Sequence, residues 1–298
     1  MIFDILFEGT TINECLEART YLPREVIIID KCGTYGSTHN IKKLKNCHHI
    51  KNLKIKKLEV DNFLVETVTP LLRPDAKILS EIKIPISYIY LDEIIVINDI
   101  KYKIPYSKYD IATSNYLSLE EKFSLNKAIT QNSHQCNEII DIVGLENIQK
   151  YFNTKPYVYP RYGMKEISEQ LSRLNAFTNI SYCLSDIQIE EDDNKKYFTY
   201  NNEKVYFKKY VERKEKEKYY FKVLVSKKQL LPRNSIVKYL RKDVTALSVD
   251  EVSKAVPVGY KIFTFWSNKK FMIQDIENIS QNDIYSEIEY EGYNEIYK

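Results

Sequence analysis

The chain of 298 residues has 44 basic and 41 acidic side chains, so its formal net charge is only +3. A charge this close to neutral argues against nucleic acid as a main partner. The length allows one large domain or two smaller ones, and 44% hydrophobic with 29% charged residues is ordinary for a globular protein.

The first predicted elements are a buried strand at 3–7, a helix after 8-EGTTIN-13, and a second buried strand at 26–30 that ends in Asp30. Strand, glycine turn, helix, strand and acid is the order of a parallel βαβ unit that binds a dinucleotide. Glycines in that turn let the backbone approach a pyrophosphate, and the acid binds a ribose hydroxyl. The sequence therefore predicts a nucleotide-binding type of α/β sheet.

The glycine fingerprint of this unit is incomplete. Only Gly9 remains of the pattern G-x-G-x-x-G, and Thr11 and Glu14 stand at the later glycine positions. Thr11 adds a side chain where the phosphate would approach, and Glu14 adds a negative charge. Gly9 still allows the turn and Asp30 still ends the strand, so the fold is kept. We predict that the chain binds no FAD or NAD.

The five cysteines are scattered, odd in number and without CxxC spacing, which is typical of a reducing compartment. We find no apolar run of bilayer length and no signal-peptide pattern, so we expect a cytoplasmic protein. The run Cys47-His48-His49 contains metal-binding residue types. Nothing near it in the sequence completes a set of four ligands, and we predict no metal site.

Residues 87–105 are predicted to form three short strands with turns at Asp92-Glu93 and Asn98-Asp99. The pattern is helical from about 107 to 152. Strands return after Cys183, at 186–190, 197–201, 204–211 and 219–228. We therefore predict a discontinuous sheet domain, residues 1–105 and 157–298, interrupted by a small helical domain at 106–156.

The segment 156-PYVYPRYGMKEISEQLSRLNAFTNISYCL-184 begins as an extended run and continues as an amphipathic helix. Apolar positions that recur at i, i+4 and i+7 are expected to face the core: Ile167, Leu171 and Leu174. Charged and amide positions are expected to face outward: Glu166, Glu169, Gln170 and Arg173. A Glu169–Arg173 pair would stabilise the helix by only about 0.3–0.5 kcal/mol. So small a gain in stability barely explains the charged face of the helix. The face could be an ordinary solvated surface or a binding surface, and the sequence leaves both interpretations open.

Two groups of residues form a wider pattern. In this segment they are Tyr159, Pro160, Tyr162, Gly163, Glu166, Arg173, Leu174, Ala176, Ser181, Tyr182, Cys183 and Leu184. Near the N-terminus they are Asp4, Gly9, Thr10, Glu14, Cys15, Asp30, Tyr35 and Gly36. Together they resemble the signature of the Rab GDP-dissociation inhibitor (GDI) and Rab escort protein family. The resemblance covers about 3–37, 58–130 and 150–190.

The resemblance implies an FAD/NAD(P)-binding-like (GDI-like) α/β sheet domain with a small helical insert domain, and no catalysis. It implies a platform for GDP-bound prenylated Rab GTPases, formed by Tyr35, Glu166, Glu169, Arg173, Tyr182 and Cys183. It also implies a shelter for the geranylgeranyl lipid, with the candidates Leu117, Phe123, Leu125, Ile129, Ile140 and Val143. The implied function is control of Rab membrane cycling in vesicle transport by a cytoplasmic protein with transient membrane contact.

Two features depart from the family pattern. The interval between Pro105 and Tyr157 is short for the family's helical domain, and Ser168 and Glu169 replace a proline and a glutamine of the platform helix. The first departure leaves little apolar chain with which to cover a lipid. The alternatives to a GDI-like regulator are a Rab escort protein, a flavin-dependent amine-oxidase-like enzyme of the same fold, and a diverged scaffold without Rab binding.

Overall fold

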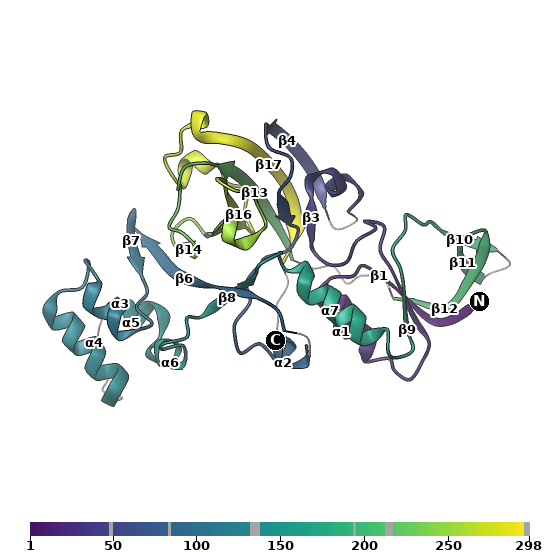
Figure 1. The fold of residues 1–298 in the computed structure, drawn as a ribbon, viewed down its shortest axis with the longest axis horizontal. Helices are drawn as coiled ribbons and strands as arrows, with labels where there is room; N and C mark the ends of the chain where they lie inside the picture. Colours follow the sequence, from purple (N-terminus) through teal and green to yellow (C-terminus); the bar gives the residue numbers. More distant parts are fainter. Residues whose placement is uncertain (48–49, 83–84, 132–137, 193–194, 212–216, 295–298) are drawn as a thin grey trace.

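The computed structural model describes residues 1–47, 50–82, 85–131, 138–192, 195–211 and 217–294. A parallel sheet with two helices lies at one end of the molecule, a larger sheet lies in the middle, and a group of short helices lies at the opposite end (Figure 1). In the part of the chain that the structure describes, no helix is long and apolar enough to cross a membrane.

The sheet at the N-terminal end contains the predicted βαβ unit. Its six strands in the described residues are, in spatial order, β10 (Ile189–Asp192), β11 (Lys195–Tyr200), β12 (Glu203–Val211), β1 (Ile2–Glu8), β2 (Val26–Ile29) and β9 (Ile180–Cys183). The last four run parallel, and β10 and β11 add an antiparallel edge. β2 is β-branched throughout and buried, as a central parallel strand requires. α1 (Ile12–Arg19) connects β1 to β2, so the predicted unit is confirmed.

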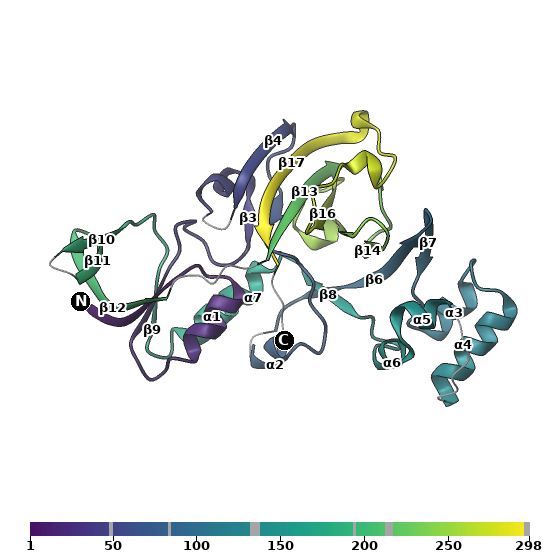
Figure 2. The ribbon, with the colours of Figure 1, turned by 180° about the vertical axis from the view of Figure 1, so that it is seen from behind.

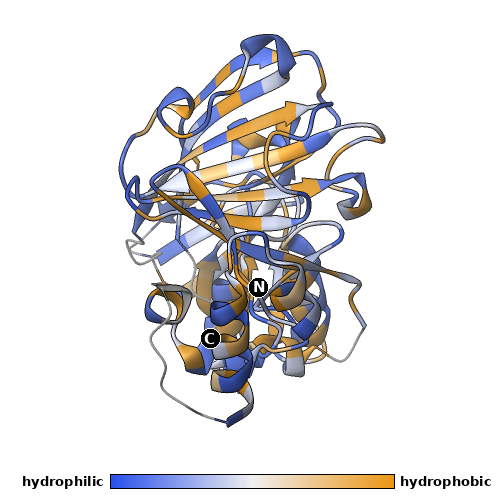
Figure 3. Ribbon diagram, turned by 90° about the vertical axis from the view of Figure 1, so that its left-hand side faces the viewer, coloured by the Kyte–Doolittle hydropathy of each residue, from blue (hydrophilic) through white to orange (hydrophobic). Residues whose placement is uncertain are grey.

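The larger sheet has nine strands in the described residues. Along its main path they are β4 (Lys51–Leu58), β17 (Ile284–Tyr293), β13 (Lys218–Ser226), β16 (Lys261–Ser267), β15 (Val244–Asp250), β14 (Ser235–Tyr239), β6 (Tyr88–Ile97) and β7 (Ile100–Lys103). β8 (Tyr157–Pro160) pairs with β6 beside this path, and β3 (Thr38–Asn40) pairs with β5 (Leu64–Glu66) in a small separate sheet. Hydrophobic residues recur along the strands of the larger sheet (Figure 3). Its central strands β15 and β16 are buried on both faces and contribute side chains to two separate hydrophobic clusters.

The region 87–105 is a hairpin of two strands. The predicted turn at Asn98-Asp99 is confirmed, and both residues have positive φ, 52° and 63°. The predicted turn at Asp92-Glu93 is wrong, because β6 continues through both residues. Glu93 is buried within the strand, and its carboxylate accepts hydrogen bonds from the Tyr106 hydroxyl and from Lys238 Nζ. Partners distant in the sequence thus stabilise an acid that the local pattern assigned to a turn.

Short helices fill the interval between β7 and β8 (Figure 2). They are α3 (Lys108–Thr113), α4 (Leu119–Gln131), α5 (Glu138–Val143) and α6 (Leu145–Lys150). Elsewhere the chain forms α2 (Lys77–Glu81), α7 (Lys165–Asn175) and the 3₁₀ helices η1 (Ile41–Asn46), η2 (Glu251–Ser253), η3 (Ile273–Asp275) and η4 (Gln281–Asp283). The division into domains at 105/106 and 156/157 stays a prediction.

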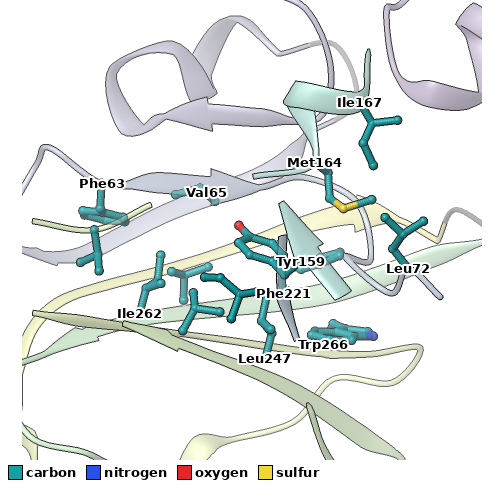
Figure 4. Close-up of a cluster of buried hydrophobic side chains, with 14 of the residues drawn as sticks. Phe63, Val65, Leu72, Tyr159, Met164, Ile167, Phe221, Leu247, Ile262 and Trp266 are labelled. Atoms are coloured by element: carbon teal, nitrogen blue, oxygen red, sulfur yellow. The ribbon is translucent and has the colours of Figure 1, made fainter. Parts of the chain in front are cut away.

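The main hydrophobic core connects α7 to the larger sheet. Tyr159 and Met164 lie between Ile167 on α7 and the aromatic side chains of Phe221 and Trp266 in the sheet (Figure 4). The predicted helix is confirmed, with Ile167 and Leu171 buried and Leu174 partly buried. This packing leaves the opposite side of α7 available as a surface.

Candidate functional site

The loop before α7 has no room for a side chain at Gly163. Its φ is +86°, and an added Cβ would lie 2.5 Å from Thr38 Cγ2 and 2.8 Å from Glu66 Oε1. The buried Glu66 carboxylate accepts hydrogen bonds from the Tyr159 hydroxyl (2.8 Å), the Met164 N–H (3.0 Å) and the Thr38 hydroxyl (2.9 Å). Burial raises the pKa of Glu66 to about 7, and these hydrogen bonds oppose the shift. Glu66 therefore fixes the start of α7 to β3 and β5.

A second glycine brings the Tyr35 loop against the side of α7. Gly36 has a φ of +82°, and an added Cβ would lie 2.8 Å from Lys165 Cα and 3.0 Å from Ser168 Cβ. The Gly36 N–H also donates a hydrogen bond to Thr10 Oγ1 at 2.9 Å. The Tyr35-Gly36 pair thus holds an aromatic ring beside the helix, because a larger residue at Gly36 would push the loop away.

The ring of Tyr35 makes an edge-to-face contact with Tyr182 of β9, with 5.5 Å between centroids and 73° between planes. The Tyr182 hydroxyl accepts a hydrogen bond from Asn175 Nδ2 at 2.8 Å, which orients the ring. Burial raises the pKa of Tyr35, Glu169 adds to the shift, and Arg173 opposes it. Both charged groups of the helix therefore act electrostatically on Tyr35.

We call Tyr35, Glu166, Glu169, Arg173 and Tyr182 the α7 face. Arg173 is exposed and Glu169 is partly exposed. Within the described residues, neither side chain takes part in an ion pair or a hydrogen bond, and the predicted Glu169–Arg173 pair is not formed. Both charges are thus available to another molecule.

Glu166 differs from these two charges because the fold already uses it in part. Its Oε2 accepts a hydrogen bond from the Tyr162 N–H at 3.3 Å. Burial raises the pKa of Glu166, and this hydrogen bond opposes the shift. Burial and the neighbouring Glu166 also raise the pKa of Tyr88 to about 12. Glu166 therefore contributes to the loop before the helix as well as to the α7 face.

One predicted platform residue is buried, and two exposed aromatic residues lie beside α7 that were not among the predicted platform residues. The Cys183 side chain is buried among the apolar residues of the six-stranded sheet, so its predicted place on an exposed platform is corrected. Phe177, just after α7, is 90% exposed, and Tyr162, just before it, is 48% exposed. Both aromatic residues flank the charged helix in the sequence. This position was the signal from which they could have been added to the predicted surface.

At the turn between β1 and α1, where the sequence pattern would place a dinucleotide, the chain's own side chains bond to one another. Thr11 caps α1, and Glu14 accepts hydrogen bonds from the Thr11 N–H (3.1 Å) and from the Thr11 hydroxyl. Asp30 accepts hydrogen bonds from the Thr10 hydroxyl (2.6 Å) and the Thr10 N–H (3.0 Å). A pyrophosphate would meet the Glu14 carboxylate at the helix N-terminus. These residues do not fit a dinucleotide, and the absence of FAD and NAD stays a prediction.

The predicted isoprenoid residues are spread over the inside and outside of the helical insert. Leu117 and Leu125 are buried in its core, and Ile129 and Val143 pack against that core. Phe123 is 74% exposed, and the side chain of Ile140 lies outside the described residues. Val143 also lines a cavity of about 150 Å³, whose other lining residues include Arg73, Glu93 and Lys238. That volume is small beside the roughly 300–1,000 Å³ of ordinary ligand pockets.

Comparison with known proteins shows the fold. The structure is similar to Rab GDI from Plasmodium falciparum, with a TM-score of 0.64 and 14% identity over 98% of this chain and 90% of that chain. It is also similar to an oxidoreductase from Methanosarcina mazei (TM-score 0.51, 9% identity, 93% and 81% covered) and to reduced UDP-galactopyranose mutase (TM-score 0.51, 9% identity, 100% and 83% covered). No family model and no curated protein matches the sequence.

These similarities confirm an FAD/NAD(P)-binding-like, GDI-like fold. They also require a correction. The prediction that the chain is not an enzyme is contradicted, because enzymes share this fold over almost the whole length of the chain.

Proposed function

We propose that the chain is a Rab GDI-like regulator that binds GDP-bound Rab GTPases through the α7 face and controls their membrane cycling. The observation that carries the proposal is the position of Glu169 and Arg173, two charges without an intramolecular partner in the described residues, beside the Tyr35–Tyr182 pair. A cytoplasmic protein with transient membrane contact would suit this function.

The chemistry of the α7 face suits a protein partner. The Arg173 guanidinium offers donors to a carboxylate or to backbone carbonyls, and the Glu169 carboxylate accepts from backbone N–H groups. Such charge-assisted hydrogen bonds contribute about 1.5–3 kcal/mol each when they are desolvated. Tyr35 and Tyr182 add rigid aromatic area of the kind that dominates protein interfaces.

The rigidity of the α7 face also supports the proposal. Gly163 and Glu66 fix the start of α7, and Gly36 fixes the loop that carries Tyr35. A surface that is ordered before binding avoids the free-energy cost of ordering its own side chains. This matters most when the partner presents mobile loops, as a GDP-bound GTPase does.

The proposal is tested with a panel of purified Rab GTPases in two nucleotide states. We expect at least one member to bind in the GDP-loaded form and to bind more weakly when loaded with a non-hydrolysable GTP analogue. The purified chain should also release that prenylated Rab·GDP from membrane vesicles. Failure of every GDP-loaded member to bind, or equal affinity for both nucleotide states, would contradict the proposal.

The lipid part of the predicted function has weaker support. Leu117 and Leu125 are already used in the core of the insert. Burial of a C20 chain stabilises by about 0.8 kcal/mol per CH₂, so a functional lipid pocket would favour prenylated over unprenylated Rab far more than tenfold. We expect a ratio below about tenfold in matched titrations, and a larger ratio would assign a lipid site to the insert.

The enzymes that share the fold favour a second candidate function, a flavin-dependent enzyme. The cofactor would lie at the turn between β1 and α1, where Thr11, Glu14 and Asp30 make the internal hydrogen bonds described above. We expect the protein purified under native conditions to show no flavin absorbance and to take up no added FAD. Stoichiometric flavin in either experiment would favour the enzyme.

A further inference from the structure

Three residues of metal-binding type meet near the carboxyl end of β2. Cys32 follows this strand, His39 lies in β3, and Cys47 follows η1. Their ligand atoms all lie within 4.8 Å of one another, and all three side chains are buried. Thiolate and imidazole are the ligands that zinc prefers, and tetrahedral zinc holds them at about 2.0–2.3 Å, so small movements would suffice to surround an ion.

The surrounding residues orient two of the three ligands. The Thr34 hydroxyl lies 3.1 Å from His39 Nδ1, which leaves Nε2 as the ring nitrogen to bind a metal. Metal-binding histidines are commonly held by such a hydrogen bond at the other ring nitrogen. The Cys32 N–H donates to Asp30 Oδ1 at 2.9 Å, which fixes the backbone at the first cysteine.

We propose that Cys32, His39 and Cys47 bind one divalent ion of the zinc class. Each thiol loses its proton to solvent when its sulfur binds the ion, and the imidazole binds in its neutral form. Two thiolates balance the two positive charges of the ion, which suits a buried site. A water molecule takes the fourth position, as in zinc sites with three protein ligands.

Binding replaces two weak contacts. The Cys32 thiol lies 3.6 Å from the Asn46 carbonyl oxygen, and the Cys47 thiol lies 3.4 Å from the Lys43 carbonyl oxygen. These S–H···O contacts are lost when the thiols are deprotonated. Two metal–sulfur bonds replace them, so metal binding should weaken as the pH falls and protons compete for the sulfurs.

The site encloses the loop that carries Tyr35. Residues 33–38 run between Cys32 and His39, so a bound ion would close this loop at both ends. The inference concerns the metal alone and does not depend on a GTPase partner. The sequence alone predicts no metal site because the residues next to Cys47 complete no set of ligands, whereas the fold brings Cys32 and His39 to Cys47.

The direct test is titration of the reduced, chelator-treated protein with Co²⁺, followed by displacement with Zn²⁺. We expect one equivalent of cobalt with the intense absorption of cobalt–thiolate bonds, and loss of this absorption when zinc is added. Cys47→Ser and His39→Asn should each weaken cobalt binding at least tenfold. Cys183→Ser is the matched control, since it removes a buried thiol outside the site and should keep the absorption.

A second control separates this site from adventitious binding by neighbouring histidines. A His48→Ala/His49→Ala double variant should keep the cobalt–thiolate absorption. The proposal is overturned if the parent shows no such absorption, if Cys47→Ser keeps it, or if the double histidine variant loses it. The proposal is also overturned if Cys32 and Cys47 form a disulfide and the protein still binds no cobalt after that disulfide has been reduced.

One further measurement uses the parent protein without any substitution, so it tests the site even if the variants fail to fold. The folded parent is treated with a thiol-alkylating reagent in the presence and absence of Zn²⁺, and each cysteine is quantified by peptide mass spectrometry. We expect zinc to slow labelling of Cys32 and Cys47 at least tenfold and to leave Cys183 unchanged. Equal slowing of all three cysteines, or of none, would contradict the site.

Discussion

The α7 face and the helical insert were predicted from one family resemblance, but their key residues behave differently in the fold. At α7 the signature glycines occupy positions with positive φ and no space for a Cβ, and the charged residues remain on the surface. In the insert, Leu117 and Leu125 are buried in a local hydrophobic core. Glycines with positive φ and exposed charged residues in a family signature therefore help to predict a binding site. A set of apolar residues does not, because packing in the core explains those residues equally well.

The largest loss of stability is expected from a substitution at the start of α7. Gly163→Ala should destabilise the protein by about 4 kcal/mol, because its positive φ is strained for alanine and its Cβ would overlap Thr38 and Glu66. Gly259→Ala is a matched control with a φ of +80° and no atom within 4 Å of the added Cβ, so only the backbone strain of about 1 kcal/mol applies. Equal losses in urea unfolding would show that the close packing at Gly163 does not matter.

The insert is tested by a pair of substitutions on α4. Leu125→Ala should cost about 3 kcal/mol, because it leaves a cavity in the local core. Phe123→Ala should change stability by less than about 0.5 kcal/mol, because its ring is 74% exposed. Thermal melts of both variants decide the point. Similar melting temperatures would mean that Leu125 faces an open space able to accept a ligand.

The pH dependence of stability sharpens the account of Glu66. Its pKa is raised by burial from 4.5 to about 7 in the folded protein. A raised carboxyl pKa means that the folded state binds the proton more tightly, so this stabilisation is complete below pH 4.5 and is lost as the pH rises through 7. The loss is on the order of 3 kcal/mol. Glu66→Gln should remove this dependence in unfolding measured from pH 4.5 to 8, and an unchanged profile would refute it.

Sequence reasoning succeeded where the signal was local. The strands on either side of α1 followed from short continuous apolar runs, and the buried stripe of α7 followed from helical periodicity. The predicted turn at Asp92-Glu93 failed because Tyr106 and Lys238 stabilise the buried Glu93. No local pattern contains those contacts.

The remaining errors at the candidate sites have the same cause. The burial of Cys183 depends on the neighbouring strands of its sheet. The cluster of Cys32, His39 and Cys47 depends on how one loop and two short elements fold together. Neither could be derived from residue spacing alone, because both depend on contacts made in the tertiary structure.

The central claim is that the α7 face binds a GDP-bound GTPase, and the Arg173→Ala variant tests it most directly. Calorimetric titration with the Rab·GDP that the parent binds should show affinity reduced about thirtyfold, or about 2 kcal/mol. The melting temperature should stay nearly unchanged, because Arg173 is exposed and takes part in no ion pair within the described residues. Arg241→Ala, an exposed arginine between β14 and β15, should keep full affinity. Parental affinity in Arg173→Ala, or a large fall in its melting temperature, would contradict the account.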